Sequence, residues 1–200
     1  MRRTILAPVL VTLGIATAGW AGDEPKPPLT VVAVPTRRML EESRRVIGEL
    51  KQRLAAALTE ALQRSPATAI AVCRTEAPAI AKAVAPAGVT VGRATRKPRN
   101  PANLATGWQA VALDHFEERA ARGAGLEGAS RSTTLPDGRI GYAEPLMVQP
   151  LCLTCHGRAN DLAPAIRDAL AVRYPADQAT GYAVGDLRGV AWVELPAPLR

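Results

Sequence analysis

The chain has 200 residues and a formal net charge of +7 at pH 7, and 48% of its residues are hydrophobic. This length suits one globular domain with an export segment. The basic residues are dispersed and lack the interleaved aromatic residues of a nucleic-acid-binding surface, so we expect no nucleic-acid partner. Only seven residues are aromatic, one Phe, three Trp and three Tyr, so alanine, leucine and valine must fill most of the core.

Residues 1–21 have the composition of a signal peptide. Arg2 and Arg3 precede an uncharged apolar segment, and the small residues of 16–18 and 19–21 offer cleavage sites. The alternative is an uncleaved membrane anchor, although the apolar segment is short for a membrane span. In either case we expect the following domain to lie in the periplasm. Cleavage would remove two arginines and lower the net charge from +7 to +5.

Residues 22–35 are rich in proline and are predicted to be a linker, and residues 36–195 to be one domain. Apolar periodicity and breaker residues predict helices over residues 36–64, 65–83, 108–122 and 163–172, and strands over residues 89–91, 139–148 and 187–195. Pro78 interrupts the second helix and should kink or restart it. Residues 93–106 and 123–137 are predicted to be loops. Helices followed by a small sheet are typical of an α+β fold, with an antiparallel sheet.

The clearest chemical motif is C-x-x-C-H at residues 152–156. This spacing is that of c-type heme attachment, in which Cys152 and Cys155 form thioethers to two vinyl-derived carbons of one heme. The neutral imidazole of His156 then ligates the iron. A disulfide or a thioredoxin-like pair needs no histidine and would be expected within a βαβ pattern, which is missing here. A zinc site would need a second ligand pair.

The sixth iron ligand has four candidates, Cys73, His115, Met39 and Met147, or the position is empty. Cys73 shares an apolar helical stripe with Ala69, Ile70, Ala77, Ile80 and Val84, which is compatible with a ligand and with a small core residue. His115 lies among charged residues and suits the surface, Met147 is only five residues before Cys152, and Met39 suits the core. A thiolate ligand would favour Fe(III) and lower the reduction potential.

A basic loop supplies candidate partners for the heme propionates. Arg93, Arg96, Lys97 and Arg99 fall within seven residues, and arginine binds carboxylates through paired hydrogen bonds. We therefore predict that at least one of the four contacts a propionate, with Arg93, Arg96 and Arg99 as the candidate heme-binding arginines. The alternative is that the loop is simply solvated.

Several segments in order resemble the Tll-like heme domain family, a PAS-like c-type heme domain first described as a domain of unknown function. The resemblance covers roughly residues 36–193 and rests on Ala71–Cys73, Arg99–Asn103, Tyr142–Pro145, Cys152–Gly157, Tyr174 to Asp177, Gly181-Tyr182 and Gly185–Gly189. It implies a PAS-like antiparallel sheet with N-terminal and flanking helices, one covalent heme c, and His156 and Cys73 as axial ligands. Residues 105–109 depart from the family pattern, because acidic residues expected there are missing.

Three functions follow from these expectations. The first is redox or small-ligand sensing through an unidentified redox or signalling protein partner, a role that the resemblance also implies. The second is a soluble periplasmic electron carrier, which the single heme and the basic balance suit. The third is a heme enzyme acting on peroxide or sulfur compounds. The sequence has no evident acid–base pair, which counts against this third function. A membrane partner is expected only if residues 1–21 stay attached.

Overall fold

The structure, a computed structural model, describes residues 34–197, which belong to one compact unit. The predicted signal peptide and residues 22–33 of the predicted linker lie outside the described residues. Within residues 34–197, no helix is long and apolar enough to span a membrane.

The N-terminal helix α1 (Arg37–Arg64) forms where the apolar periodicity predicts it. The hydroxyl of Thr36 caps the helix by accepting a hydrogen bond from the Met39 amide at 3.3 Å. Ser65 ends α1 and caps the next helix, α2 (Pro66–Ala71), where its hydroxyl accepts from the Thr68 amide. Ser65 and Pro66 therefore join the two helices, and the Ser65 hydroxyl satisfies an amide in the first turn of the second helix.

A π-helical turn, η1 (Val72–Glu76), separates α2 from α3 (Ala77–Val84). The Ala77 amide donates to the Val72 carbonyl, five residues back, because the proline at position 78 has no N–H to continue the regular ladder. The predicted interruption at Pro78 is confirmed, and it takes the form of a wide turn that contains Cys73. Such π-helical turns occur frequently at functional sites.

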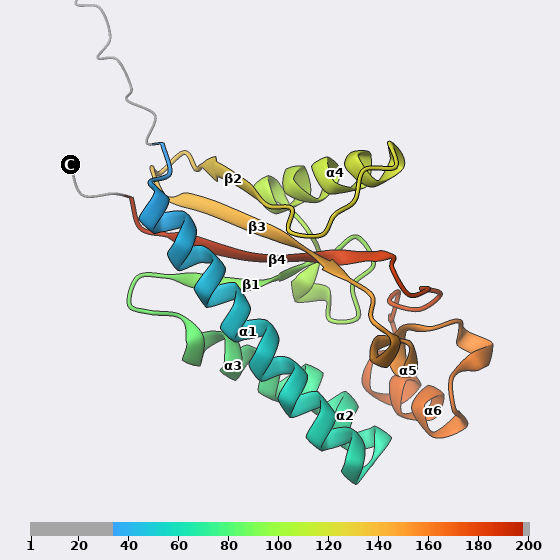
Figure 1. Ribbon diagram of the computed structural model, residues 1–200. Helices are drawn as coiled ribbons and strands as arrows, with labels where there is room; N and C mark the ends of the chain where they lie inside the picture. Colours follow the sequence, from blue (N-terminus) through green and yellow to red (C-terminus); the bar gives the residue numbers. More distant parts are fainter. Residues whose placement is uncertain (1–33, 198–200) are drawn as a thin grey trace, which may run out of the picture. The chain divides into compact units, whose positions relative to one another are not determined.

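The sheet consists of β1 (Thr90–Ala94), β2 (Arg131–Thr134), β3 (Ile140–Met147) and β4 (Leu187–Leu195). Its order is β1-β4-β3-β2 and every neighbouring pair is antiparallel (Figure 1). The α+β class and the antiparallel sheet are thus confirmed, and β4 has the predicted bounds. The PAS-like assignment of this sheet remains a prediction of the resemblance.

Two predicted loops need correction. β1 continues to Ala94, so Arg93 lies in a strand, and residues 131–134 form the edge strand β2. The sequence of β2, Arg-Ser-Thr-Thr, lacks alternating apolar residues because this strand pairs with β3 alone and buries little. Hydrophobic alternation therefore could not reveal it.

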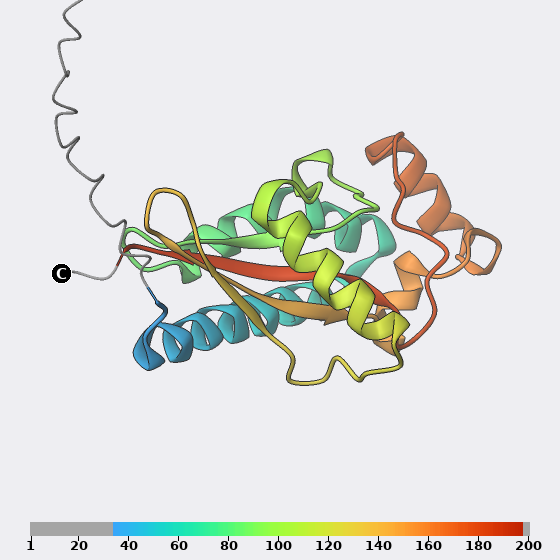
Figure 2. The ribbon, with the colours of Figure 1, turned by 90° about the horizontal axis from the view of Figure 1, so that it is seen from above.

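Helices cover both faces of the sheet. Val46, Ile47 and Leu50 of α1 pack with Tyr142 and Val193 on one face. On the other face, α4 (Gly107–Ala121) lies across β3 and β4 (Figure 2), where its buried Leu113 and Phe116 share a cluster with Ala143 and Val190. Because side chains alternate along β3 and β4, these two strands contribute residues to the apolar clusters on both faces of the sheet.

Between β3 and β4 the chain forms a separate helical excursion, with α5 (Leu153–His156) and α6 (Pro164–Arg173) (Figure 1). α6 packs against α2, where Ile70 lies among Ile166, Leu170 and Tyr174. Cys155 of the C-x-x-C-H motif packs against the same cluster, beside the helix that precedes the π-helical turn.

We predict that Gly189→Ala destabilises the fold. An added Cβ at Gly189 would clash with the carbonyl oxygen of Ala94 on the neighbouring strand β1, and overpacking of this kind costs about 1–3 kcal/mol. The measurement is the free energy of unfolding from denaturant titration.

The control is Gly48→Ala in α1, where nothing lies within 4 Å of the added Cβ. That substitution should stabilise the protein by about 0.5–1 kcal/mol, because alanine favours the helix. Equal effects of the two substitutions would contradict the close approach of β1 and β4.

Candidate functional site

A cavity of about 540 Å³ brings together residues that are far apart in the sequence. Its lining includes Cys73 of the π-helical turn, Cys152, and Cys155 and His156 of α5. The volume lies within the range of cofactor pockets, roughly 300–1,000 Å³. All three cysteines are free thiols, and burial raises the pKa of Cys155. The predicted attachment motif therefore faces a cavity and contains no disulfide.

The imidazole of His156 is held in a defined tautomer and orientation. Its Nδ1 lies 2.6 Å from the carbonyl oxygen of Ala179, so Nδ1 carries the proton and donates it to this bond. Burial lowers the pKa of His156 to about 3, with further contributions from the charges of Arg99 and Arg188. The neutral ring keeps the lone pair of Nε2 available, as a metal ligand requires.

A buried ion pair connects the attachment motif to the segment that orients His156. Arg99 is only 7% exposed, and its Nη2 donates to the Cys155 carbonyl at 2.6 Å. Its Nε donates to one carboxylate oxygen of Asp177 at 3.1 Å. The other carboxylate oxygen accepts from the Ala179 amide at 2.8 Å. Arg99 and Asp177 thus link α5 to Ala179, whose carbonyl accepts from His156.

The structure separates the arginines that the sequence analysis grouped. Arg93 and Arg99 line the cavity, whereas Arg96 does not, because its guanidinium pairs with Asp114 and Glu117 of α4. Arg96 follows Ala94 by two residues and lies on the same side, toward α4. Since side chains alternate along a strand, Arg93 lies on the opposite side. Arg96 thus lies away from the cavity, while the predicted contact of this basic loop with a heme stays a prediction.

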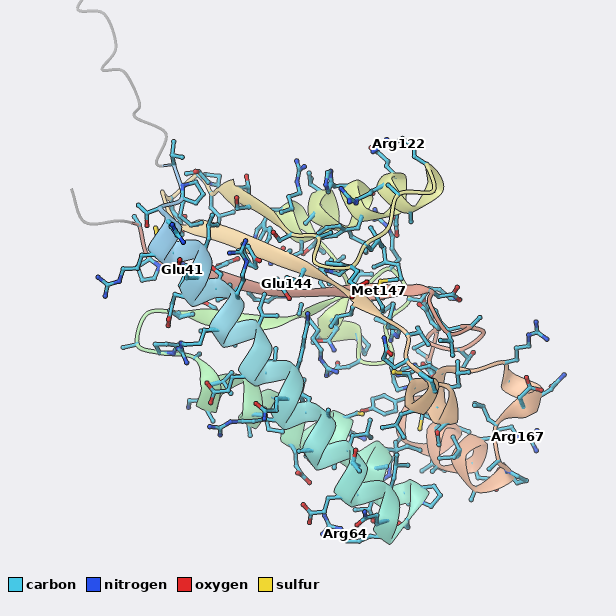
Figure 3. The ribbon with its side chains drawn as sticks, viewed as in Figure 1. Glu41, Arg64, Arg122, Glu144, Met147 and Arg167 are labelled. Atoms are coloured by element: carbon cyan, nitrogen blue, oxygen red, sulfur yellow. The ribbon has the colours of Figure 1, made fainter. Side chains whose placement is uncertain are left out.

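The four residues predicted as candidates for a sixth ligand differ in whether they line the cavity. Cys73 and Met147 line it, with Met147 at the end of β3 beside the turn toward α5 (Figure 3). Met39 packs against the core around α1, as predicted. His115 is half-buried on α4, with its ring against Phe116. Met147 lines the cavity five residues before Cys152, and the prediction that it cannot reach the opposite heme face stays a prediction.

Two polar residues of the cavity were not identified as site residues by sequence reasoning. Arg188 donates through Nη1 to the Thr95 hydroxyl at 2.7 Å, yet its Nε is buried without a hydrogen-bond partner among the described residues. The hydroxyl of Tyr174 is likewise buried and unpartnered there. Both residues occur in segments that carry the family resemblance, but their types and spacing alone gave no sign of a shared site.

The fold and the site define a small α+β domain in which a C-x-x-C-H motif faces a cavity of cofactor size. The sequence model described as Tll0287-like matches residues 32–196. The chain belongs to the Tll0287-like family.

A solved structure, the crystal structure of the cyanobacterial heme-protein Tll0287, is similar in fold. The TM-score is 0.60 at 24% sequence identity, and the alignment covers 82% of this chain and 99% of that chain. No curated protein matches this chain. The similarity in structure therefore extends over nearly all of the heme-protein, while the sequences have diverged widely.

We predict that Asp177→Asn lowers the free energy of unfolding by about 3 kcal/mol, because it leaves the buried charge of Arg99 without its partner. The side chains of Arg99 and Asp177 are only 7% and 12% exposed, so solvent screens the pair weakly. Denaturant titration measures the loss.

Asp186→Asn is the matched control. Asp186 also accepts from a backbone amide, that of Ala183 at 2.7 Å, but it is exposed and forms no ion pair within residues 34–197. Its substitution should cost less than about 1 kcal/mol. Equal losses for the two variants would show that the ion pair contributes nothing beyond the backbone hydrogen bond.

Proposed function

We propose that this chain is an exported c-type cytochrome domain that holds one heme through thioethers to Cys152 and Cys155, with His156 as an axial ligand. The observation that carries the proposal is the convergence of both thiols and the oriented imidazole on one cavity. Membership of a family named after a heme-protein is consistent with it.

The other residues of the cavity fit the same group. Arg93, Arg99 and Arg188 place positive charge at the wall, and a heme brings two propionate carboxylates that pair well with guanidinium groups. Arg93 has no hydrogen bond or ion pair among the described residues, and the unpartnered Nε of Arg188 is costly without an acceptor. Of the predicted propionate contacts, Arg93 is therefore better placed than Arg99, whose nitrogens bond to protein groups.

We assign Cys73 as the second axial ligand. Cys73 lies on the π-helical turn opposite α5, and α6 packs directly against the preceding helix α2. Bound heme supplies one-electron chemistry and an iron that takes up small ligands. His156 would bind the iron through Nε2 and Cys73 would bind it as a thiolate, a pair of ligands that would favour Fe(III).

A thiolate that can leave the iron suits redox or small-ligand sensing in the periplasm, with a signalling or redox protein as partner. Electron transfer is the second candidate function. It is favoured by the exposure of the motif, since Leu151 is 44% exposed and Thr154 is also exposed, next to the attachment cysteines. A partner protein could approach the heme at this edge.

We predict that Cys73→Ala changes the absorption and electron paramagnetic resonance spectra of the ferric holoprotein, because the low-spin signature of a thiolate ligand is lost. In the reduced state the open iron of this variant should bind carbon monoxide faster than that of the wild type. Both proteins are produced in a host that attaches c-type heme.

Met147→Leu is the matched control, since Met147 lines the same cavity and the change preserves volume. Its spectra should match those of the wild type. A loss of the low-spin signature in Met147→Leu but not in Cys73→Ala would show that the Met147 sulfur, and not the Cys73 sulfur, ligates the iron. Fast, reversible potentiometric cycling without any response to carbon monoxide or nitric oxide would favour the electron carrier.

A further inference from the structure

The Tyr174 hydroxyl is buried at the cavity without a hydrogen-bond partner among the described residues. Tyr174 follows α6, is only 7% exposed and lines the cavity. Its hydroxyl is buried and makes no hydrogen bond to any described residue. Burying an unpaired hydroxyl is unfavourable, so such a group in a cofactor cavity indicates an acceptor that the bound state supplies.

The surroundings of Tyr174 identify that acceptor. Its ring packs in a cluster with Ile70 of α2, and Cys73 follows Ile70 by three residues, close to one helical turn. Tyr174 and Cys73 line the same cavity. Burial raises the pKa of Tyr174, and negative charge on Cys73 raises it further, which is consistent with the two groups lying near each other.

The heme propionates are the competing acceptors. Cys155 packs against the same cluster as Tyr174, and the thioethers are made at the two porphyrin rings that carry no propionates. We take the sulfur of Cys73 as the acceptor, because Cys73 follows Ile70, a neighbour of Tyr174, by three residues and lines the same cavity.

We propose that the Tyr174 hydroxyl donates a hydrogen bond to the Cys73 sulfur in the heme-loaded protein and thereby raises the reduction potential of the iron. This inference rests on the proposed ligation by Cys73. A donor to a ligating sulfur withdraws electron density from it, which weakens its preference for Fe(III). Tyr174 is therefore a positioning residue that acts through Cys73.

The test is the midpoint potential of the Tyr174→Phe holoprotein, because this change removes only the hydroxyl oxygen. We expect the Fe(III)/Fe(II) equilibrium to shift toward Fe(III) by roughly tenfold, which lowers a one-electron potential by about 59 mV. Tyr142→Phe is the matched control, since the Tyr142 hydroxyl bonds to Glu144 and does not line the cavity. It should leave the potential unchanged.

A second pair of proteins separates this inference from the proposed ligation. In the Cys73→Ala background, adding Tyr174→Phe should leave the potential unchanged, because the acceptor is gone. A shift that persists there would assign the hydroxyl to another acceptor and overturn the inference. An unshifted potential in Tyr174→Phe, while Cys73→Ala loses its thiolate spectrum, would also overturn it. If Cys73→Ala keeps the wild-type spectrum, the ligation itself fails.

Discussion

The geometry of the site depends on the buried ion pair between Arg99 and Asp177. One guanidinium nitrogen holds the Cys155 carbonyl, and the carboxylate holds the amide of Ala179, whose own carbonyl orients His156. A buried charge is tolerated only with its partner and with satisfied hydrogen bonds. The pair therefore fixes α5 and the residue 177–179 segment together, and the imidazole has one orientation as a result.

The opposite wall of the cavity is built by a different constraint. Pro78 cannot donate a backbone hydrogen bond, and the helix responds with a π-helical turn around Cys73. The packing of α2 on α6 brings this turn and Cys155 of the attachment helix to the same cavity. The sheet closes the remaining side, where Gly189 allows β4 to approach β1 closely. The ion pair, the π-helical turn, the packing of α2 on α6 and the close approach at Gly189 together form one cavity of cofactor size.

The parts of this arrangement that were predictable from the sequence are those with local causes. The periodicity of α1, the caps at Ser65 and the interruption at Pro78 act within a few residues, and the attachment motif is contiguous. The edge strand β2 was not predicted, because its residues are polar and show no alternation of apolar and polar side chains.

Residues whose roles depend on long-range contacts were harder to assign. Arg96 and Arg99 look equivalent in the sequence, yet Arg96 pairs with α4 and Arg99 is buried beneath the motif. Tyr174 reaches the cavity because α6 packs against α2, and Arg188 reaches it from β4, which lies between β1 and β3 in the sheet. Met147 also lines the cavity, at the end of β3, which its spacing from Cys152 alone does not show. Such placements follow from the tertiary structure and not from spacing.

The most direct measurement is the mass of the denatured chain, purified from a host that attaches c-type heme. The account predicts that wild type and Cys73→Ala both retain heme on the unfolded polypeptide, because only Cys152 and Cys155 form thioethers. The double variant Cys152→Ser/Cys155→Ser should have the mass of bare peptide. A colourless wild-type chain of bare peptide mass would contradict the account.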